Sequence, residues 1–295
     1  MKIKKDHGWA DVAFDVIVHG LLLVLVVVTL YPLLYVAFAS FSDAGRLVAH
    51  QGFLFYPLGF SLEAYVSVFK NPGILTGYRN TLFILVFGVA VNLIFTAIGA
   101  YVLSRRGVMW NRMFMMVIVL TMFFGGGLIP LYLVVKGVGL IDSLWATIIP
   151  FTVNTFNLII MRTAFQSVPE SLEESAKMDG AGHLTILLRI FVPLSMPVIA
   201  VMILYYAVEK WNGWFYASIF LKDHDLFPLQ LVLREILISN STDAMTANAA
   251  NAERFQIGET IKYATIMVAT VPILCVYPFV QKYFVKGVMV GALKG

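Results

Sequence analysis

PESLEESAKMDGAGHLTILLRIFVP, residues 169–193, is a compact polar stretch between long apolar runs, and the rest of the chain can be organised around it. Ser167, followed three residues later by Glu170, predicts a capping box at the start of a helix. Pro169 falls in the first turn, where its missing N–H costs little. The acidic residues that follow favour the positive, N-terminal end of the helix dipole. The stretch therefore opens with a short, exposed helix.

The second half of the stretch predicts a turn and another helix. Asp179-Gly180-Ala181-Gly182 breaks the first helix, because Gly180 can adopt the left-handed conformation that ends it. An apolar segment then runs from His183 to Val192, and Pro193 closes it. A helix, a glycine elbow and a second helix form a shape typical of a docking element.

This hairpin resembles the EAA loop of the permease subunits of bacterial ABC importers. The resemblance rests on nine matched positions, which are Glu174-Ser175-Ala176, Asp179-Gly180-Ala181, Ile190 and Val192-Pro193. The family prefers Ala where Ser175 stands and Leu where Val192 stands, so both are mild departures. The resemblance implies that the loop docks a cytoplasmic ATPase through Glu170, Glu173, Glu174, Ser175, Ala176, Asp179, Gly180 and Ala181. The alternative is an amphipathic cytoplasmic hairpin that carries some of these residues without docking an ATPase.

The composition predicts an integral membrane protein. Of 295 residues, 60% are hydrophobic and only 13% are charged, whereas charged residues supply about a quarter of a soluble domain. The net charge of +4 is small and spread over loops, so it indicates a membrane surface rather than nucleic acid. The lone Cys275 excludes an intrachain disulfide.

Apolar runs of about twenty residues predict a single all-α transmembrane domain over residues 1–295 with six spanning helices. The spans are expected at about 16–39, 80–103, 113–135, 143–161, 193–211 and 262–283, with the coupling loop at 167–193. The third span contains Gly125-Gly126-Gly127 and Pro130. Such breaks are tolerated in a membrane only where protein or a water-lined cavity satisfies the freed backbone groups.

The basic residues predict the orientation of these spans. Six spans place both termini, the loop after the second helix and the 167–193 loop on one face, which carries twelve of the 21 Lys and Arg residues. Arg105, Arg106 and Arg112 lie in a short loop between helix ends, where the positive-inside rule weighs most. We therefore expect a multi-pass protein of a bacterial cytoplasmic membrane with cytoplasmic termini and with residues 222–259 outside.

The chain shows no pattern typical of an enzyme. No stretch fits the P-loop spacing G-x-x-x-x-G-K-[ST], so ATP and magnesium are expected on a partner ATPase and no cofactor on this chain. The five histidines are scattered and none has a partner at metal-ligand spacing.

Two groups of polar residues in the predicted spans are candidates for a substrate path. Thr147, Pro150, Asn154 and Asn157 would share one stripe of a continuous fourth helix. The carboxamides of Asn154 and Asn157 suit the hydroxyls of a sugar. Alternatively, they form hydrogen bonds between helices. Asn92 shares a face of the second helix with Gly88 and Gly99, which indicates close packing.

The second group lies at the predicted outer end of the fifth helix. Glu209-Lys210 is followed by Trp211, Asn212 and Trp214, with Tyr216 close by. These residues form either an interfacial aromatic belt with a self-compensating ion pair or a vestibule where rings stack on sugars and charges bind hydroxyls.

Along most of its length the chain resembles carbohydrate-importer permeases of the MalG type, and within them an LplC-like branch. The likeness is carried by Arg79-Asn80-Thr81-Leu82, the run MFFGGGLIPLYLVVKGVGLIDSLWA, Met161-Arg162, residues 211–216 and the C-terminal GVMVGALKG. It implies a type I ABC-importer permease fold and alternating access. It also implies four kinds of partner: a second, homologous permease, two ATPase copies, an extracytoplasmic sugar-binding protein and an oligosaccharide. A permease for a peptide or polyamine, or a stand-alone secondary transporter, remains open; the latter should show an embedded acidic or histidine relay.

Overall fold

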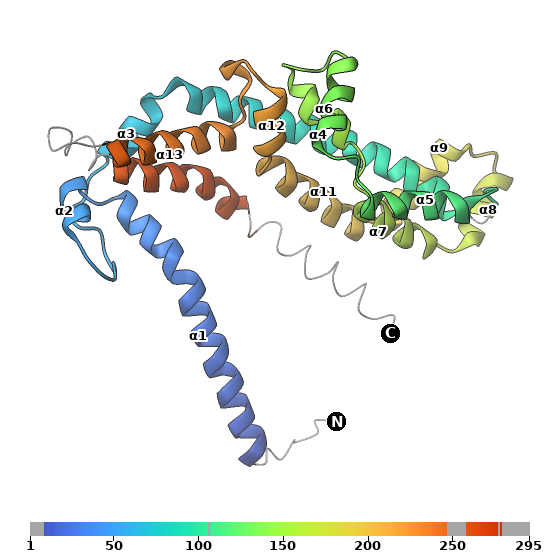
Figure 1. The fold of residues 1–295 in the computed structure, drawn as a ribbon. Helices are drawn as coiled ribbons and strands as arrows, with labels where there is room; N and C mark the ends of the chain where they lie inside the picture. Colours follow the sequence, from blue (N-terminus) through green and yellow to red (C-terminus); the bar gives the residue numbers. More distant parts are fainter. Residues whose placement is uncertain (1–8, 106, 247–257, 277, 279–295) are drawn as a thin grey trace. The chain divides into compact units, whose positions relative to one another are not determined.

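The computed structural model describes residues 9–105, 107–246, 258–276 and 278, and the regular structure of these residues is helical (Figure 1). The predicted all-α class is therefore confirmed for the part of the chain that is described. The helices of the described residues, in chain order, are α1 (Trp9–Ser40), α2 (Ala44–Ala49), α3 (Glu63–Lys70), α4 (Pro72–Ser104), α5 (Asn111–Phe123), α6 (Leu128–Gly137), η1 (Leu144–Thr147), η2 (Ile149–Phe151), α7 (Thr155–Gln166), α8 (Glu170–Met178), α9 (His183–Ile186), η3 (Leu187–Phe191), α10 (Val192–Leu194), α11 (Met196–Trp211), α12 (Phe215–Phe220), η4 (His224–Leu226), α13 (Leu229–Thr246) and a further helix at Gly258–Val276.

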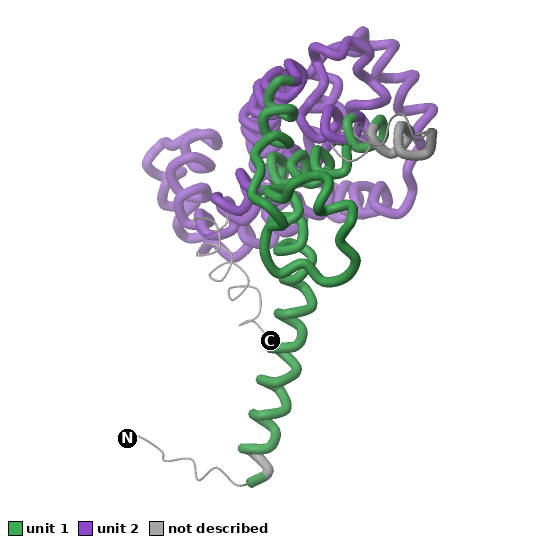
Figure 2. The backbone as a smooth tube through the Cα atoms, turned by 90° about the vertical axis from the view of Figure 1, so that its left-hand side faces the viewer, with its two compact units in different colours: residues 1–70, 236–270 green, residues 71–235, 271–295 purple. Residues whose placement is uncertain are grey.

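The chain divides into two compact units (Figure 2). Unit 1 comprises residues 1–70 and 236–270, and unit 2 comprises residues 71–235 and 271–295. In unit 1 the long α1 ends at a small core of Ala39, Leu47 and Leu54, and the Ser40 hydroxyl lies 2.8 Å from the Tyr65 hydroxyl. The apolar length of α1 is exposed on this chain, as expected for a surface that faces lipid or another subunit.

Unit 2 is built around α4, a helix of 33 residues that packs against α7 and α11. Its core gathers apolar residues from these helices and from the second half of the 169–193 stretch. The buried members are Ala100, Tyr101, Leu103, Leu158, Met161, Phe165, Ile186, Leu187, Phe191, Val201 and Met202. The polar hairpin is thus anchored on the same core as the spanning helices.

Three of the described helices are long and apolar enough to cross a membrane, and up to six spans result if each of three bent helix pairs counts as one. The three single helices are Val12–Ser40, Pro72–Ser104 and Gly258–Val276. The second span was predicted from about residue 80, but α4 begins at Pro72. Asn71 caps it by accepting a hydrogen bond from the Gly73 N–H at 2.9 Å, and the fixed φ of Pro72 suits the first helical position.

The third and fourth spans are bent pairs rather than straight helices. α5 and α6 meet at 114° across Gly125–Gly127, where Gly127 has φ +84°, so the glycine run breaks the helix as its composition indicated. The predicted fourth span, at about 143–161, is not one continuous helix. Short 3-10 turns occupy Leu144–Phe151, and α7 starts only at Thr155, at 51° to them. Pro150 lacks the N–H that would continue an α-helix there.

The fifth span differs from its prediction at its start. The segment His183–Leu194 continues through Pro193 and then bends by 88° into α11, so Pro193 does not close it. The predicted end of the sixth span at 283 lies outside the described residues. So do Lys2, Lys4, Lys5 and Arg106, as well as the C-terminal GVMVGALKG.

A hydrogen-bonded clasp joins the loop after α6 to the loop after α12 within unit 2. The Asp142 carboxylate accepts hydrogen bonds from the Lys222 N–H at 2.8 Å and the Asp223 N–H at 2.9 Å, and the Asp142 N–H donates to the Phe220 carbonyl at 2.8 Å. Asp142 has φ +62°, which is uncommon outside glycine. The two N–H donors, that of Asp223 first, lower the pKa of the Asp142 carboxyl below its usual value.

Candidate functional site

The start of α8 differs from the predicted capping box. Ser167 ends α7 instead, and its hydroxyl donates to the Ala164 carbonyl at 2.7 Å. Pro169 occupies the N-cap position of α8 without a side-chain hydrogen bond, and Glu170 is the first helical residue. Ser167 caps the C-terminus of α7 and is therefore not the N-cap of α8, because only Val168 and Pro169 lie between Ser167 and the first residue of α8.

The glycine elbow is confirmed. Gly180 has φ +78°, its N–H donates to the Lys177 carbonyl at 3.0 Å, and the Ala181 N–H donates to the Ala176 carbonyl at 2.9 Å. This pair of bonds is the Schellman arrangement that ends a helix with a left-handed residue. It fixes the angle at which the chain leaves α8.

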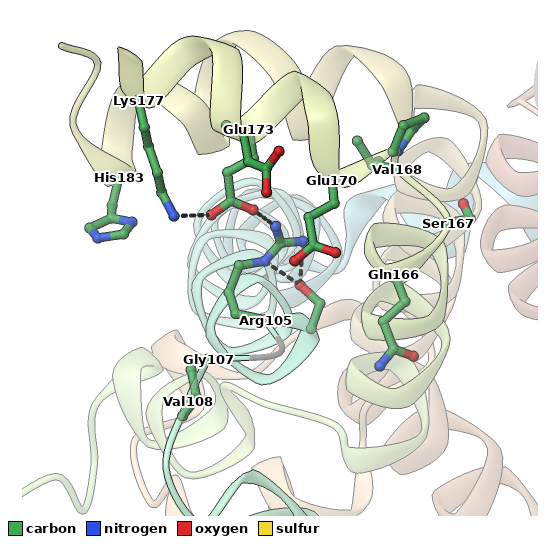
Figure 3. Close-up of a pocket in the computed structure, with 13 residues that line it drawn as sticks. Arg105, Gly107, Val108, Gln166, Ser167, Val168, Glu170, Glu173, Lys177 and His183 are labelled. Atoms are coloured by element: carbon green, nitrogen blue, oxygen red, sulfur yellow. Dashed lines mark hydrogen bonds and ion pairs between the residues drawn. The ribbon is translucent and has the colours of Figure 1, made fainter. Parts of the chain in front are cut away.

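The two neighbouring acidic residues of α8 differ in burial. The Glu173 side chain is only 6% exposed, forms an ion pair with Arg105, and lies 3.0 Å from the Lys177 Nζ (Figure 3). Glu174 is exposed. Both were predicted to contact an ATPase, but the structure turns Glu173 toward the body of unit 2. Glu173 therefore holds α8 in place rather than presenting its charge to a partner.

Arg105 connects α8 to the end of α4 and to the core. Its Nε and Nη2 donate to the Ser104 hydroxyl at 3.3 and 3.1 Å, and its guanidinium carbon lies 4.2 Å from the centre of the Phe191 ring. Burial lowers the pKa of the Arg105 guanidinium, while Tyr101 and Glu170 raise it, and an arginine stays charged at neutral pH. One side chain thus ties together α4, α8 and η3.

A polar cavity of about 600 Å³ adjoins this cluster (Figure 3). Its lining comes from the end of α4, the α7–α8 connection and α8 itself: Ser104, Arg105, Gly107, Val108, Gln166, Ser167, Val168, Pro169, Glu170, Glu173, Glu174, Lys177 and His183. Of the residues predicted for coupling, Glu170, Glu173 and Glu174 line this cavity. Glu170, Glu174, Ser175, Asp179 and Gly180 are exposed, whereas Ala176 and Ala181 are half-buried against the unit 2 core.

The predicted stripe of the fourth span does not form. Asn154 is the N-cap of α7, and its Oδ1 accepts hydrogen bonds from the Phe156 N–H at 3.0 Å and the Asn157 N–H at 3.2 Å. Asn157 is buried in the first turn of α7, while Thr147 belongs to a separate 3-10 turn. A helix cap accounts for the Asn154 carbonyl oxygen, so the even spacing of these residues did not reflect one helix face.

Asn92 is buried at the centre of α4 with both carboxamide atoms lacking a hydrogen-bond partner among the described residues. One turn further along α4, the Thr96 hydroxyl lies 2.7 Å from the Tyr206 hydroxyl of α11. The Tyr206 hydroxyl also accepts the Asn154 N–H at 3.4 Å. A polar seam therefore runs through the packed interior between α4, α7 and α11, and Asn92 is its unsatisfied member.

A second cavity, of about 280 Å³, lies at the end of α11. Its lining includes Thr147, Phe151, Glu209, Lys210, Asn212 and the segment 213–217, so Trp214 is part of it. Trp211 is buried and does not line this cavity, and its indole N–H lacks a partner among the described residues. Glu209 and Lys210 were interpreted either as a self-compensating ion pair or as sugar-binding charges; they lie 4.0 Å apart, with Lys210 buried and Glu209 exposed.

Sequence reasoning treated two of these functional candidates too simply. Arg105 served only as a marker of orientation, and Lys210 was considered only together with Glu209, as an ion pair or as sugar-binding charges, without its burial. The missing signal for Arg105 was a buried acid one helix away, which spacing along the chain cannot reveal. For Lys210 the signal was available, because a cation at the end of an apolar helix is expensive unless it has a function or a partner.

Residues 108–290 of the chain match the family described as "Binding-protein-dependent transport system inner membrane component". The polygalacturonan/rhamnogalacturonan transport system permease protein YtcP of Bacillus subtilis is 42% identical over 96% of this chain and 98% of its own length. Protein LplC of the same organism is 44% identical over 91% of this chain and 90% of its own length.

A solved structure gives the same result for the fold. One chain of a bacterial ABC transporter involved in the import of the acidic polysaccharide alginate superposes with a TM-score of 0.85, at 34% identity, over 94% of this chain and 99% of that one. The predicted type I permease fold is thereby confirmed. The chain belongs to the binding-protein-dependent transport system inner membrane component family.

Proposed function

We propose that this permease carries an oligosaccharide into the cell, with the exposed face of α8 receiving the motion of an ATPase. The observation that carries this proposal is the division of α8 into two sides. Glu173 binds α8 to Arg105, while Glu174, Ser175 and Asp179 stay exposed beside the Gly180 elbow. A short helix that is fixed to the bundle on one side and exposed on the other can transmit a push as a rigid body.

The exposed side of α8 also has an apolar component that suits a protein partner. Met178 is 88% exposed and Leu184, just beyond the elbow, is 64% exposed. Apolar side chains surrounded by carboxylates are typical of a docking surface and are unfavourable in water. We assign this surface to one of two ATPase subunits, which hold the ATP and magnesium.

Family membership defines the wider assembly that we propose. The chain is a transport component rather than an enzyme, and it is expected to pair with a second, homologous permease in the cytoplasmic membrane and to receive its sugar from an extracytoplasmic binding protein. Both termini and α8 are assigned to the cytoplasm. A stand-alone secondary transporter is disfavoured, since the family works with binding proteins, and the relatives named for polysaccharides favour a sugar over a peptide or polyamine.

The docking assignment is tested by changing one charge on each side of α8. Glu174→Lys should lower recovery of the ATPase with the purified permease pair without changing the pair's melting temperature, because Glu174 is exposed. Glu173→Gln should instead destabilise the pair by about 1–3 kcal/mol, since it leaves Arg105 without its buried partner.

Glu63→Lys, an exposed acid in α3, is the matched control for surface charge. ATPase recovery is measured by co-purification, and stability by thermal unfolding in detergent. Undiminished ATPase recovery and normal uptake in Glu174→Lys would contradict the assignment of α8 as the docking element.

A further inference from the structure

The cavity at the end of α11 holds one buried cation among aromatic rings. The cation is Lys210, and Phe151, Trp214, Phe215 and Tyr216 contribute the rings. The volume of about 280 Å³ lies just below the ~300–1,000 Å³ typical of small-molecule sites. The cavity therefore suits one sugar residue of a chain rather than a whole oligosaccharide.

The charge of Lys210 is only partly compensated in unit 2. Its side chain is 4% exposed, and its Nζ donates one hydrogen bond, to the Thr147 carbonyl at 3.3 Å. An ammonium group has three donors. Glu209 Oε1 lies 4.0 Å away, at the limit of an ion pair, on a side chain that is 44% exposed. A desolvated ammonium with so distant a counterion is unfavourable, so the site favours an additional anion.

The position of Lys210 is specified by its surroundings. A Cβ added at Gly88 of α4 would lie 3.2 Å from the Lys210 Cε and 3.4 Å from its Cγ and Cδ, so the glycine makes room for the lysine stem. On the cavity side, the Lys210 Nζ lies 5.7 Å from the centre of the Phe151 ring. The stem is held by α4 and the ammonium is presented beside a ring, which is the arrangement of a binding group.

We infer that Lys210 binds the carboxylate of a uronic-acid residue in the transported oligosaccharide, while the surrounding rings stack on the sugar faces. The inference rests on the proposed function and narrows its substrate class to acidic oligosaccharides. A carboxylate supplies the charge-assisted hydrogen bonds that a neutral sugar cannot, and the aromatic rings supply apolar faces. One relative is named for polygalacturonan, and the solved relative for alginate, an acidic polysaccharide. Before substrate arrives, Glu209 is the weak counterion that the carboxylate replaces.

The test uses the complete complex in proteoliposomes, with the binding protein outside and ATP supplied to the ATPase. Uptake is measured for labelled trimers of galacturonate and of mannuronate, each beside the same trimer with its carboxyls reduced to hydroxymethyl groups. The variants are Lys210→Met, Lys210→Gln and Lys210→Arg, with Lys222→Met as the matched control for losing an exposed lysine. One binding protein serves every variant, so differences between variants belong to the permease.

We expect wild type to import at least one acidic trimer faster than its reduced form. Lys210→Met and Lys210→Gln should lower acidic uptake roughly ten-fold or more, and reduced-trimer uptake far less, because only the acidic sugar loses a charge-assisted bond. Lys210→Arg should restore most of the acidic uptake, and Lys222→Met should match wild type.

Each contrary result has a distinct meaning. An equal loss for acidic and reduced trimers, an unchanged ratio between them, or failure of both neutral variants to assemble would show that the lysine is structural and would overturn the inference. Import of reduced trimers alone by wild type would overturn it while leaving the oligosaccharide function intact. Import of none of the trimers by wild type would contradict the proposed function itself.

Discussion

At the scale of single residues, Asn92 is buried in α4 and has no hydrogen-bond partner in the part of the chain that the structure describes, whereas Thr96, one turn along, is satisfied by Tyr206. A buried, unpaired carboxamide costs about 1–3 kcal/mol, and leucine has a similar volume without that cost. We expect Asn92→Leu to keep or raise the melting temperature of the permease pair and to lower uptake, because a group retained at such a cost should meet the substrate path.

Thr96→Val is the matched control for Asn92→Leu. It removes a paired hydroxyl from the same helix, so it should lose about 1 kcal/mol of stability. Thermal unfolding set beside oligosaccharide uptake separates the outcomes. A more stable Asn92→Leu protein with normal uptake would show that Asn92 does not contact the substrate. A less stable Asn92→Leu protein would mean that the assembled complex supplies a hydrogen-bond partner for the Asn92 amide.

Asp142 gives a prediction about pH. Its carboxyl pKa is depressed by the Asp223 and Lys222 N–H donors, so the carboxylate form stabilises the fold above the usual pKa of about 4. That contribution should be lost as the pH falls through the depressed value. Asp142→Asn keeps an acceptor and tolerates positive φ but cannot titrate. The difference in melting temperature between wild type and Asp142→Asn should therefore shrink below about pH 4, and a constant difference would contradict the clasp.

At the scale of elements, the elbow after α8 depends on one backbone conformation. A Cβ added at Gly180 would meet nothing within 4 Å, so the cost of Gly180→Val is the strain of φ +78°, about 1–3 kcal/mol. We expect that variant to insert in the membrane but to lose transport. Gly182 also has open space but sits at φ −74°, so Gly182→Val should be tolerated. Uptake and membrane yield of the two variants provide the measurement, and equal activities would show that the elbow angle is unimportant.

The elements also show what sequence reasoning could reach. The elbow, the glycine break between α5 and α6 and the all-α class follow from local chemistry, and all three are present in the structure. The straight fourth span and the capping box failed because a residue that suits two neighbouring elements can serve only one. Ser167 ends α7, and Asn154 caps the start of α7 rather than lying within one continuous helix. The burial of Glu173 and Lys210 depends on contacts far along the chain, which spacing does not contain.

At the scale of the whole molecule, orientation in the membrane is the prediction on which the docking proposal depends. In a background where the exposed Cys275 is replaced by serine, single cysteines at Ser175 and at Asp243 report the two sides. A membrane-impermeant thiol reagent added to intact cells should label position 243 and spare position 175, because short basic loops stay in the cytoplasm. Labelling after the cells are broken is the control for reactivity. The reverse pattern would place α8 out of reach of any ATPase.

The number of residues in the π-helical turn of η3 sets the orientation of the preceding segment relative to α11. The Val192 N–H bonds to the Leu187 carbonyl five residues back, so this turn contains one residue more than an α-turn. Deleting one residue of η3 would tighten the turn to α geometry. The preceding segment, which includes α8 and the elbow, would then rotate by about 100° relative to α11. Phe191 could then no longer lie under Arg105 while the elbow kept its direction. Two chains of nearly identical composition could thus differ in whether ATP hydrolysis reaches the sugar, through a deletion that removes no charged group.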